Sequence, residues 1–254
     1  MSESLKELRE RLQGPRRPYD TWYGRNVMRR FSIYLTVFFA RMGGSPPLVT
    51  SLSILAGLFG AFCLWIGWWG WGFFWVNMWY LLDHVDGELA RLGQSSSATG
   101  LYFDTIANAI VPPFTFLALG VGLRLHTERE LPFFLSLIAA YASMMLLMIT
   151  YCESAVLLQC AKGPIPSPAG ERVSSRPTLL KAAFLALHTA VAFPSFLLAT
   201  TVRLLLVSFA LPQARPLFLM VCLYLYAVAA TVVWVTLLAH SVWTKGPDRK
   251  LAGR

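Results

Sequence analysis

Long apolar runs follow one another along most of the chain, separated by short polar segments or by segments rich in proline and glycine. Several of these runs reach the roughly 20 residues that a helix needs to cross the hydrocarbon core of a bilayer. The pattern therefore predicts an all-α integral membrane protein. Six transmembrane helices are expected, over residues 48–67, 71–92, 100–122, 131–160, 179–208 and 216–243. Pro194 lies inside the fifth of them and predicts a kink there.

The chain before the first span divides into two segments of different character. Residues 1–24 are polar and basic, and we expect a partly ordered cytoplasmic tail. Residues 25–42 interleave arginines with aromatic and aliphatic residues, and their apolar part is too short to span comfortably. This pattern predicts an N-terminal interfacial amphipathic helix, with a short additional span as the alternative. The membrane domain thus covers residues 25–243, and residues 244–254 form a second basic tail, also expected to be cytoplasmic.

Small residues recur at helical spacing in the first predicted span. Ser53, Gly57 and Ala61 are four residues apart, so they lie on one face of a helix. A stripe of small side chains lets a neighbouring helix approach closely. We therefore expect a close helix contact there, with chance placement in a helix rich in small residues as the alternative.

The composition agrees with a membrane protein, and the charge distribution gives its orientation. The chain of 254 residues is 56% hydrophobic and only 14% charged, with a formal net charge of +9. A basic balance can indicate nucleic acid, an anionic membrane surface or phosphorylated substrates. Here the basic residues lie in loops and tails, so we predict no nucleic-acid partner.

The loops that carry the basic residues alternate with the predicted spans. The segments on one side are 1–47, 91–99, 161–181 and 244–254, and they hold 18 of the 22 Lys and Arg residues. Because cytoplasmic loops are enriched in Lys and Arg, both termini are predicted to be cytoplasmic. The end of the second span and the start of the third then lie on the cytoplasmic side as well.

Acidic residues collect at that junction, in an otherwise apolar part of the chain. One face of the second span carries Asp83, Asp86, Gly87 and Ala90, and one face of the third carries Gly100, Asp104 and Asn108. The short connection makes the two helices antiparallel, so these faces can oppose each other. Close carboxylates repel unless a cation neutralises them, and hard oxygen ligands suit Mg²⁺, Mn²⁺ or Ca²⁺. The alternatives are an exposed polar helix end, or ion pairs with arginines of the tail.

Small residues beside the acids leave room for a ligand. Gly87 and Ala90 lie on the same face, where a flat group could approach the backbone. Arg91 is adjacent and could meet a phosphate through its guanidinium group. The residues therefore predict a site that holds a cation and a phosphate together.

The stretch also resembles a known signature. In order it is Asp83-x2-Asp86-Gly87-x2-Ala90-Arg91-x8-Gly100-x3-Asp104-x3-Asn108. It is similar to the motif of the CDP-alcohol phosphotransferase (CDP-alcohol phosphatidyltransferase) family, and every fixed position except the last agrees with the spacing intact. The segment "PPLVT", residues 46–50, resembles a proline-to-threonine segment that lines the nucleotide site in that family.

The resemblance implies a reaction, cofactors and partners. A CDP-linked alcohol, commonly the lipid CDP-diacylglycerol, would bind through its pyrophosphate to two divalent cations, Mg²⁺ or Mn²⁺. A second alcohol would attack phosphorus and CMP would leave, which is a step of phospholipid biosynthesis. The catalytic residues and metal ligands would be Asp83, Asp86, Asp104 and Asn108. The CDP side would comprise Thr50, Gly87, Ala90, Arg91 and Gly100. By analogy with the family, a homodimer is a further expectation.

Asn108 departs from the family's motif, which has a fourth aspartate at this position. The resemblance assigns that aspartate as general base and metal ligand. An amide oxygen can still coordinate a hard cation, but it cannot take a proton at neutral pH. Another group, such as Asp104, His84 or solvent, would then deprotonate the acceptor. Otherwise the chain is a catalytically impaired or silent family member that binds a CDP-lipid.

The acceptor alcohol has weaker signals. Arg172, Arg176 and Lys181 could meet an acceptor phosphate, although ordinary inside-positive charge explains them equally well. Glu153, near the inner end of the fourth span, could favour an amine-bearing acceptor or pair with a loop arginine. A cation-coupled transporter is a second hypothesis. It predicts acids near the membrane midplane and symmetry between the halves, and the sequence has no such repeat.

Overall fold

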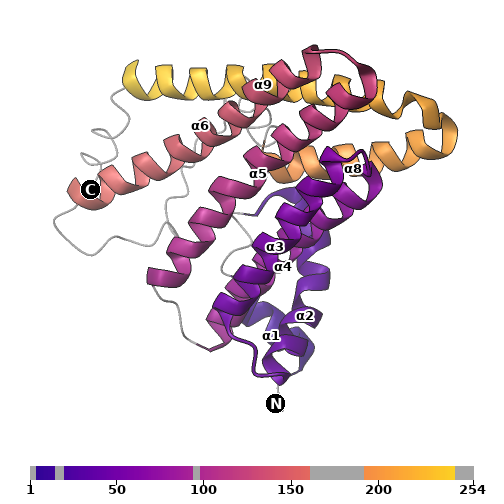
Figure 1. Cartoon of the computed structure of the whole chain (residues 1–254). Coiled ribbons are helices and arrows are strands. Elements are labelled where there is room, and N and C mark those ends of the chain that lie inside the picture. The colour runs from indigo at the N-terminus through magenta and orange to yellow at the C-terminus, as the bar shows by residue number, and fades with distance from the viewer. Residues whose placement is uncertain (1–3, 15–19, 94–97, 161–191, 244–254) are drawn as a thin grey trace.

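The computed structural model describes residues 4–14, 20–93, 98–160 and 192–243, and within these residues all regular structure is helical. The long helices are α3 (Pro46–Trp65), α4 (Trp69–Leu92), α5 (Ala98–Thr127), α6 (Leu131–Cys160), α8 (Phe193–Ala210) and α9 (Arg215–Trp243). Before them come α1 (Leu5–Gln13), one turn of π-helix, η2 (Gly24–Met28), and α2 (Arg29–Arg41), and the short η3 (Pro212–Ala214) precedes α9. Figure 1 shows α1 and α2 gathered beside α3 and α4.

Five of the described helices are long and apolar enough to cross a membrane. They are α3, α5, α6, α8 and α9, the last counted together with η3. The remaining long helix, α4, has 24 residues but carries Asp83, Asp86, Glu88 and Arg91 in its second half. An integral membrane protein is therefore confirmed, whereas the sixth span stays a prediction.

The long helices pack in a closed order, α4–α3–α5–α6–α9–α8, with α8 returning to α4. α3 is wedged between α4 and α5 and makes the most extensive contacts in the bundle. Aromatic rings fill the centre. Phe116 of α5 stacks on Tyr226 of α9 with ring centroids 4.3 Å apart, and it lies 5.0 Å from Phe196 of α8. Such offset and tilted pairs contribute about 0.5–1.5 kcal/mol each beyond their buried area.

Glycines set the short distances between α3 and its neighbours. A Cβ on Gly57 would lie 2.5 Å from the Val111 side chain of α5, and a Cβ on Gly60 would lie 2.9 Å from the Gly72 carbonyl oxygen of α4. Ser53 and Ala61 are buried as well. The predicted small-residue stripe is confirmed, and it contacts both flanking helices.

Pro194 does not kink the interior of a helix. Ala192 has an extended ψ of 133° and caps α8, so the proline falls in the first turn. A proline is tolerated there because the first backbone N–H groups have no partner within the helix. Residues 179–191 of the predicted fifth span lie outside the described residues. The prediction of a kink was wrong, because the helix begins where we expected it to bend.

Part of the N-terminal tail is a helix. Ser4 and Glu7 form a reciprocal capping box at the start of α1. Leu8 and Leu12 are buried and pack with Ile33 of α2. The helices α1 and α2 thus share a small apolar cluster. This helix was not predicted from the sequence, since only three of its nine residues are apolar.

The helix α2 has an unusual distribution of side chains. It buries Ser32 and Thr36, while Phe31, Tyr34 and Phe38 are more than half exposed. Exposed aromatic residues of this kind suit the membrane–water interface. The interfacial position of this segment stays a prediction.

The segment before α2 is tied to the bundle by a buried hydrogen-bond chain. The hydroxyl of Tyr23 donates to Asn77 of α4, whose amide donates to Thr201 of α8. Burial raises the pKa of Tyr23 to about 12, so the phenol stays protonated and remains a donor. Gly24 follows, and a Cβ there would lie 2.8 Å from the Tyr80 hydroxyl. The absence of a side chain therefore lets the π-turn lie directly on α4.

Candidate functional site

The two acidic faces meet at the end of α4 and the beginning of α5. The Asn108 amide nitrogen lies 3.4 Å from Asp83 Oδ1 and 3.1 Å from Asp104 Oδ1, so a single amide spans carboxylates of both helices. α4 and α5 have few direct backbone contacts, because α3 packs between them. The side chains of Asp83, Asp104 and Asn108 therefore meet although α4 and α5 do not pack directly against each other.

Asp86 belongs to the same end of the bundle and is held by α3. Its Oδ2 accepts a hydrogen bond of 2.6 Å from the Thr50 hydroxyl, one turn from the start of α3. Thr50 and Asp86 are both buried. Asp86 is also near enough to Asp104 to interact electrostatically. The "PPLVT" segment thus contributes a side chain that orients one acid of the motif.

The donor set has the chemistry that a divalent cation needs. Three carboxylates and one amide oxygen are hard ligands of the type found around Mg²⁺ and Mn²⁺. In the described part of the chain, no group of three or more Asp, Glu, His or Cys side chains is already arranged to hold an ion. Here the Asn108 NH₂ group faces the acids, and rotation about its side-chain amide would present oxygen instead. The chemical type of these ligands fits a divalent metal ion. In this structure the Asn108 amide lies between the carboxylates of Asp83 and Asp104.

Gly87 and Arg91 lie one turn apart beside the acids. A Cβ on Gly87 would approach the Arg91 guanidinium at 3.4 Å, so the glycine keeps the space next to this cation clear. Arg91 Nε donates 2.7 Å to the backbone carbonyl of Leu12 at the end of α1. The predicted phosphate-binding arginine is therefore oriented by the N-terminal helix. Ala90 and Gly100 are partly exposed near the same junction.

His84 does not face the acidic site. Its Nδ1 lies 2.8 Å from the Tyr80 carbonyl oxygen of its own helix. Its Nε2 is the atom that a Cβ on Gly24 would approach at 3.1 Å, on the side of α4 covered by η2. His84 is thus a packing residue, and the suggestion that it could replace the missing base was wrong.

The fourth acid of the stretch, Glu88, has a separate environment that sequence reasoning missed. It is fully buried and accepts hydrogen bonds from Ser32, Thr36 and Gln13 at 2.6, 2.7 and 2.9 Å. Arg29 Nη1 lies 3.6 Å away. The signal was present in α2, where Ser32 and Thr36 form a polar pair at i, i+4 within an aromatic segment. Glu88 therefore joins α1 and α2 to the helix that carries Asp83 and Asp86.

The predicted acceptor residues cannot be placed. Arg172, Arg176 and Lys181 lie outside the described residues. Glu153 lies on α6, but its side chain is outside the described set. Their roles stay predictions.

Known proteins resemble this chain in both sequence and fold. The family model CDP-alcohol phosphatidyltransferase matches residues 44–244. No curated protein matches the chain significantly. Among solved structures, Mycobacterium tuberculosis phosphatidylinositol phosphate synthase (PgsA1) with CDP-DAG bound superposes with a TM-score of 0.58, at 22% identity, over 85% of this chain and 94% of that one.

The same mycobacterial protein resembles the chain in two other states. Its apo form gives a TM-score of 0.55 at 23% identity, covering 83% of this chain and 95% of that one. Its complex with manganese and citrate gives 0.55 at 24% identity, covering 84% and 90%. At this level of identity the structural similarity establishes only a shared fold. The family model, in contrast, matches the sequence over most of the chain. The chain therefore belongs to the CDP-alcohol phosphatidyltransferase family, membrane transferases of phospholipid biosynthesis.

Proposed function

We propose that this protein transfers a phosphatidyl group, or another substituted phosphoryl group, from a CDP-alcohol to a second alcohol and releases CMP. CDP-diacylglycerol is the expected donor. One observation carries the proposal: side chains of the family motif from α4 and α5 meet at a single amide, within hydrogen-bonding distance. The family match over residues 44–244 supports the reaction class, and a CDP-DAG-bound structural neighbour supports the lipid donor.

Each residue at the junction has a proposed role. Two divalent cations, Mg²⁺ or Mn²⁺, would be held by Asp83, Asp86, Asp104 and the Asn108 amide oxygen. When bound, they supply the positive charge that neutralises the pyrophosphate and the developing charge on oxygen. The Thr50 hydroxyl fixes the orientation of Asp86. Arg91 would bind a phosphate oxygen, and Gly87, Ala90 and Gly100 leave room for the nucleotide.

The transfer exchanges one phosphorus–oxygen bond for another. The acceptor hydroxyl oxygen bonds to the phosphorus that bears the lipid, the bond from this phosphorus to CMP breaks, and the acceptor loses a proton. Asn108 cannot take that proton because an amide is not basic at neutral pH. Asp104 shares its contact with Asn108 and is the described carboxylate best placed to do so, with solvent as the alternative.

A silent CDP-lipid-binding protein is the second candidate, and Asn108 favours it. Loss of general-base assistance typically costs about 10²–10⁴-fold in rate, which slows a reaction without ending it. A cation-coupled transporter is disfavoured, because Asp83 and Asp86 lie in the second half of α4 and Asp104 lies in the first quarter of α5, toward one end of the bundle. We place this end of the bundle on the cytoplasmic side, where a water-soluble acceptor meets the lipid.

The test is CMP release by the purified full chain supplied with CDP-diacylglycerol, Mg²⁺ or Mn²⁺ and a panel of acceptors. The panel includes glycerol phosphate, inositol phosphate, serine and ethanolamine, because the basic loop favours a phosphate and Glu153 favours an amine. We expect release by the parent, and release about 10²-fold faster or more in Asn108→Asp. Asp83→Ala should lose both turnover and metal-dependent CDP-lipid binding, whereas Glu130→Ala should retain both. If the parent and Asn108→Asp both bind the CDP-lipid and neither releases CMP, the silent alternative is correct. If neither of these two forms binds the CDP-lipid or releases CMP, the proposal is refuted.

A further inference from the structure

A basic pocket of about 770 Å³ lies between α1, η2 and the beginning of α2. It is separate from the acidic site, and all of its lining residues fall between positions 6 and 34. The family match begins at residue 44. The family assignment therefore gives this pocket no role.

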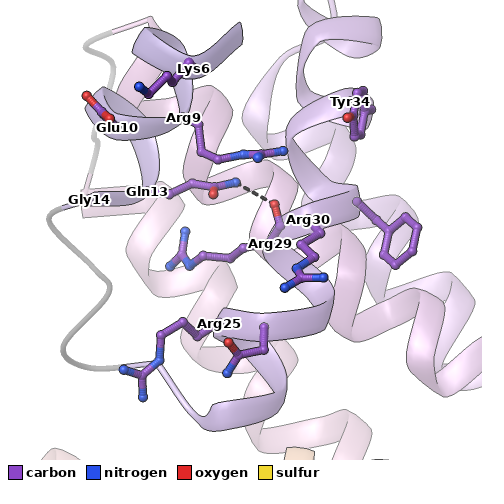
Figure 2. Close-up of a pocket in the computed structure, with 11 residues that line it drawn as sticks. Lys6, Arg9, Glu10, Gln13, Gly14, Arg25, Arg29, Arg30 and Tyr34 are labelled. Carbon is purple, nitrogen blue, oxygen red and sulfur yellow. Dashed lines mark hydrogen bonds between the residues drawn. The ribbon is translucent and has the colours of Figure 1, made fainter.

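Positive charge dominates the lining. The cationic side chains are Lys6, Arg9, Arg25, Arg29 and Arg30, against a single acid, Glu10. Figure 2 shows Arg9 extending from α1 across toward α2, with Arg29 and Arg30 extending from the first turn of α2. Among the described residues only Arg29 of these five cations has a carboxylate within 4 Å. The other four cations are therefore not neutralised by described acids.

Two buried guanidinium atoms among the lining residues make no hydrogen bond within the described part of the chain. Arg29 is only 6% exposed, and the nearest carboxylate oxygen to its Nη1, on Glu88, is 3.6 Å away, beyond hydrogen-bonding distance. Arg9 Nε is likewise buried and unsatisfied there. Leaving a buried charged donor without an acceptor is costly, by about 1–3 kcal/mol or more. Arg29 is already paired with Asp20 and Glu88, so the atom that an anion between α1 and α2 would satisfy is Arg9 Nε.

The rim of the pocket shows where that anion would come from. Phe31 and Tyr34 line it and are each 58% exposed, and Phe38 continues the same exposed aromatic row along α2. Aromatic side chains gather at the level of lipid headgroups, and guanidinium groups pair with phosphate oxygens in a bidentate manner. A pocket that combines both at one edge suits a headgroup whose acyl chains lie beside the aromatic row.

We propose that this pocket binds a phosphate group, supplied by the headgroup of an anionic phospholipid. Arg9, Arg25 and Arg30 contact the phosphate, and Phe31 and Tyr34 contact the lipid at the interface. Gln13 and Arg29 form the floor and also contact Glu88 of α4. The bound lipid would therefore secure the N-terminal helices to the helix that carries the family motif, without taking part in the transfer.

The test measures lipid binding by the full chain in uncharged detergent. The probes are dihexanoyl-phosphatidylglycerol, dihexanoyl-phosphatidylcholine and glycerol phosphate, titrated separately. The pocket variant is Arg25→Gln with Arg30→Gln, two exposed residues outside the proposed catalytic machinery. The matched control, Arg41→Gln with Arg124→Gln, removes the same charge from positions that do not line the pocket. All titrations are repeated in Asp83→Ala, so that binding at the acidic site does not contribute.

We expect the parent and the control to bind the anionic lipid, and the pocket variant to bind it about tenfold more weakly or worse, because two charge-assisted contacts are lost. The zwitterionic lipid should bind weakly to all forms. Binding of glycerol phosphate as tight as that of the lipid, with the same dependence on Arg25 and Arg30, would assign the pocket to a soluble phosphate and overturn the lipid source. Equal loss in pocket variant and control, or no loss in either, would overturn the pocket itself. If Arg25→Gln with Arg30→Gln still weakens lipid binding when Asp83→Ala is also present, the pocket binds lipid whether or not the proposed transfer reaction occurs.

Discussion

Asp83 and Glu88 are five residues apart on α4 and meet opposite environments. Asp83 faces other acids and the Asn108 amide, an arrangement suited to a cation. Glu88 faces Ser32, Thr36 and Gln13, which already satisfy its oxygens. Five residues turn a helix by about 140° from the starting face, so two acids of one short stretch can serve different purposes. Asp83 belongs to the proposed site, whereas Glu88 fixes α1 and α2 to the helix that carries this site.

The buried carboxylate of Glu88 should contribute far more to stability than an exposed one. In Glu88→Ala three buried donors each lose one hydrogen-bond acceptor and Arg29 loses a nearby charge, so we expect the free energy of unfolding to fall by about 3–5 kcal/mol. The matched control is Glu130→Ala, which removes the exposed ion pair with Arg124 and should cost less than about 1 kcal/mol. Unfolding of both variants in mixed detergent micelles would measure the difference. Equal losses would show that the Glu88 cluster does not anchor the N-terminal helices.

Helix boundaries in the membrane domain follow closely from local sequence. α6 and α9 span Leu131–Cys160 and Arg215–Trp243, against predictions of 131–160 and 216–243. α5 runs to Thr127, beyond the predicted end at 122, because Arg124 and His126 can continue a helix past the hydrocarbon core. The convergence of Asp83, Asp104 and Asn108 was also predictable, since helical periodicity and a short turn determine it. These features depend on residues near one another in the sequence.

Other features depend on contacts between distant residues, and they were not predictable in this way. The Glu88 cluster joins residues 52 to 75 positions apart, and no local pattern records such a pairing. The wedge of α3 between α4 and α5 is also a tertiary property. We predicted that α4 and α5 would face each other. Because α3 lies between them, side chains of the two helices meet near one end, but the helices do not pack directly against each other.

The close approach of α3 and α4 should depend on Gly60. In Gly60→Ala the new Cβ would lie 2.9 Å from the Gly72 carbonyl oxygen, and relief requires the helix backbones to separate. We expect a loss of about 1–3 kcal/mol in the free energy of unfolding, as for other overpacked sites. Gly70→Ala is the control, because nothing lies within 4 Å of its Cβ position, and it should be neutral or slightly stabilising. A neutral Gly60→Ala would mean that α3 and α4 can separate without cost.

The two ends of the whole bundle differ in chemistry. At one end, Trp68 and Trp71 are exposed beside the α3–α4 turn, and His126 at the end of α5 packs on Trp69. The opposite end carries the acidic site together with α1, η2 and α2. Tryptophans favour both interfaces, but Lys and Arg favour the cytoplasmic one. Since the described basic residues of α1, η2 and α2 lie at the acidic end, we predict that this end faces the cytoplasm.

This orientation predicts which residues can be reached from outside the cell. Arg129 lies in the exposed α5–α6 turn at the tryptophan end, and Gly93 caps α4 at the acidic end. With the native cysteines replaced, a membrane-impermeant maleimide applied to intact cells should label Arg129→Cys and leave Gly93→Cys unlabelled. Both should react after permeabilisation, which controls for folding and access. The reverse pattern would put the acidic site on the outer side, away from cytoplasmic CMP and acceptor alcohols. It would remove the physical reason for combining a lipid donor and a water-soluble acceptor at that end of the bundle.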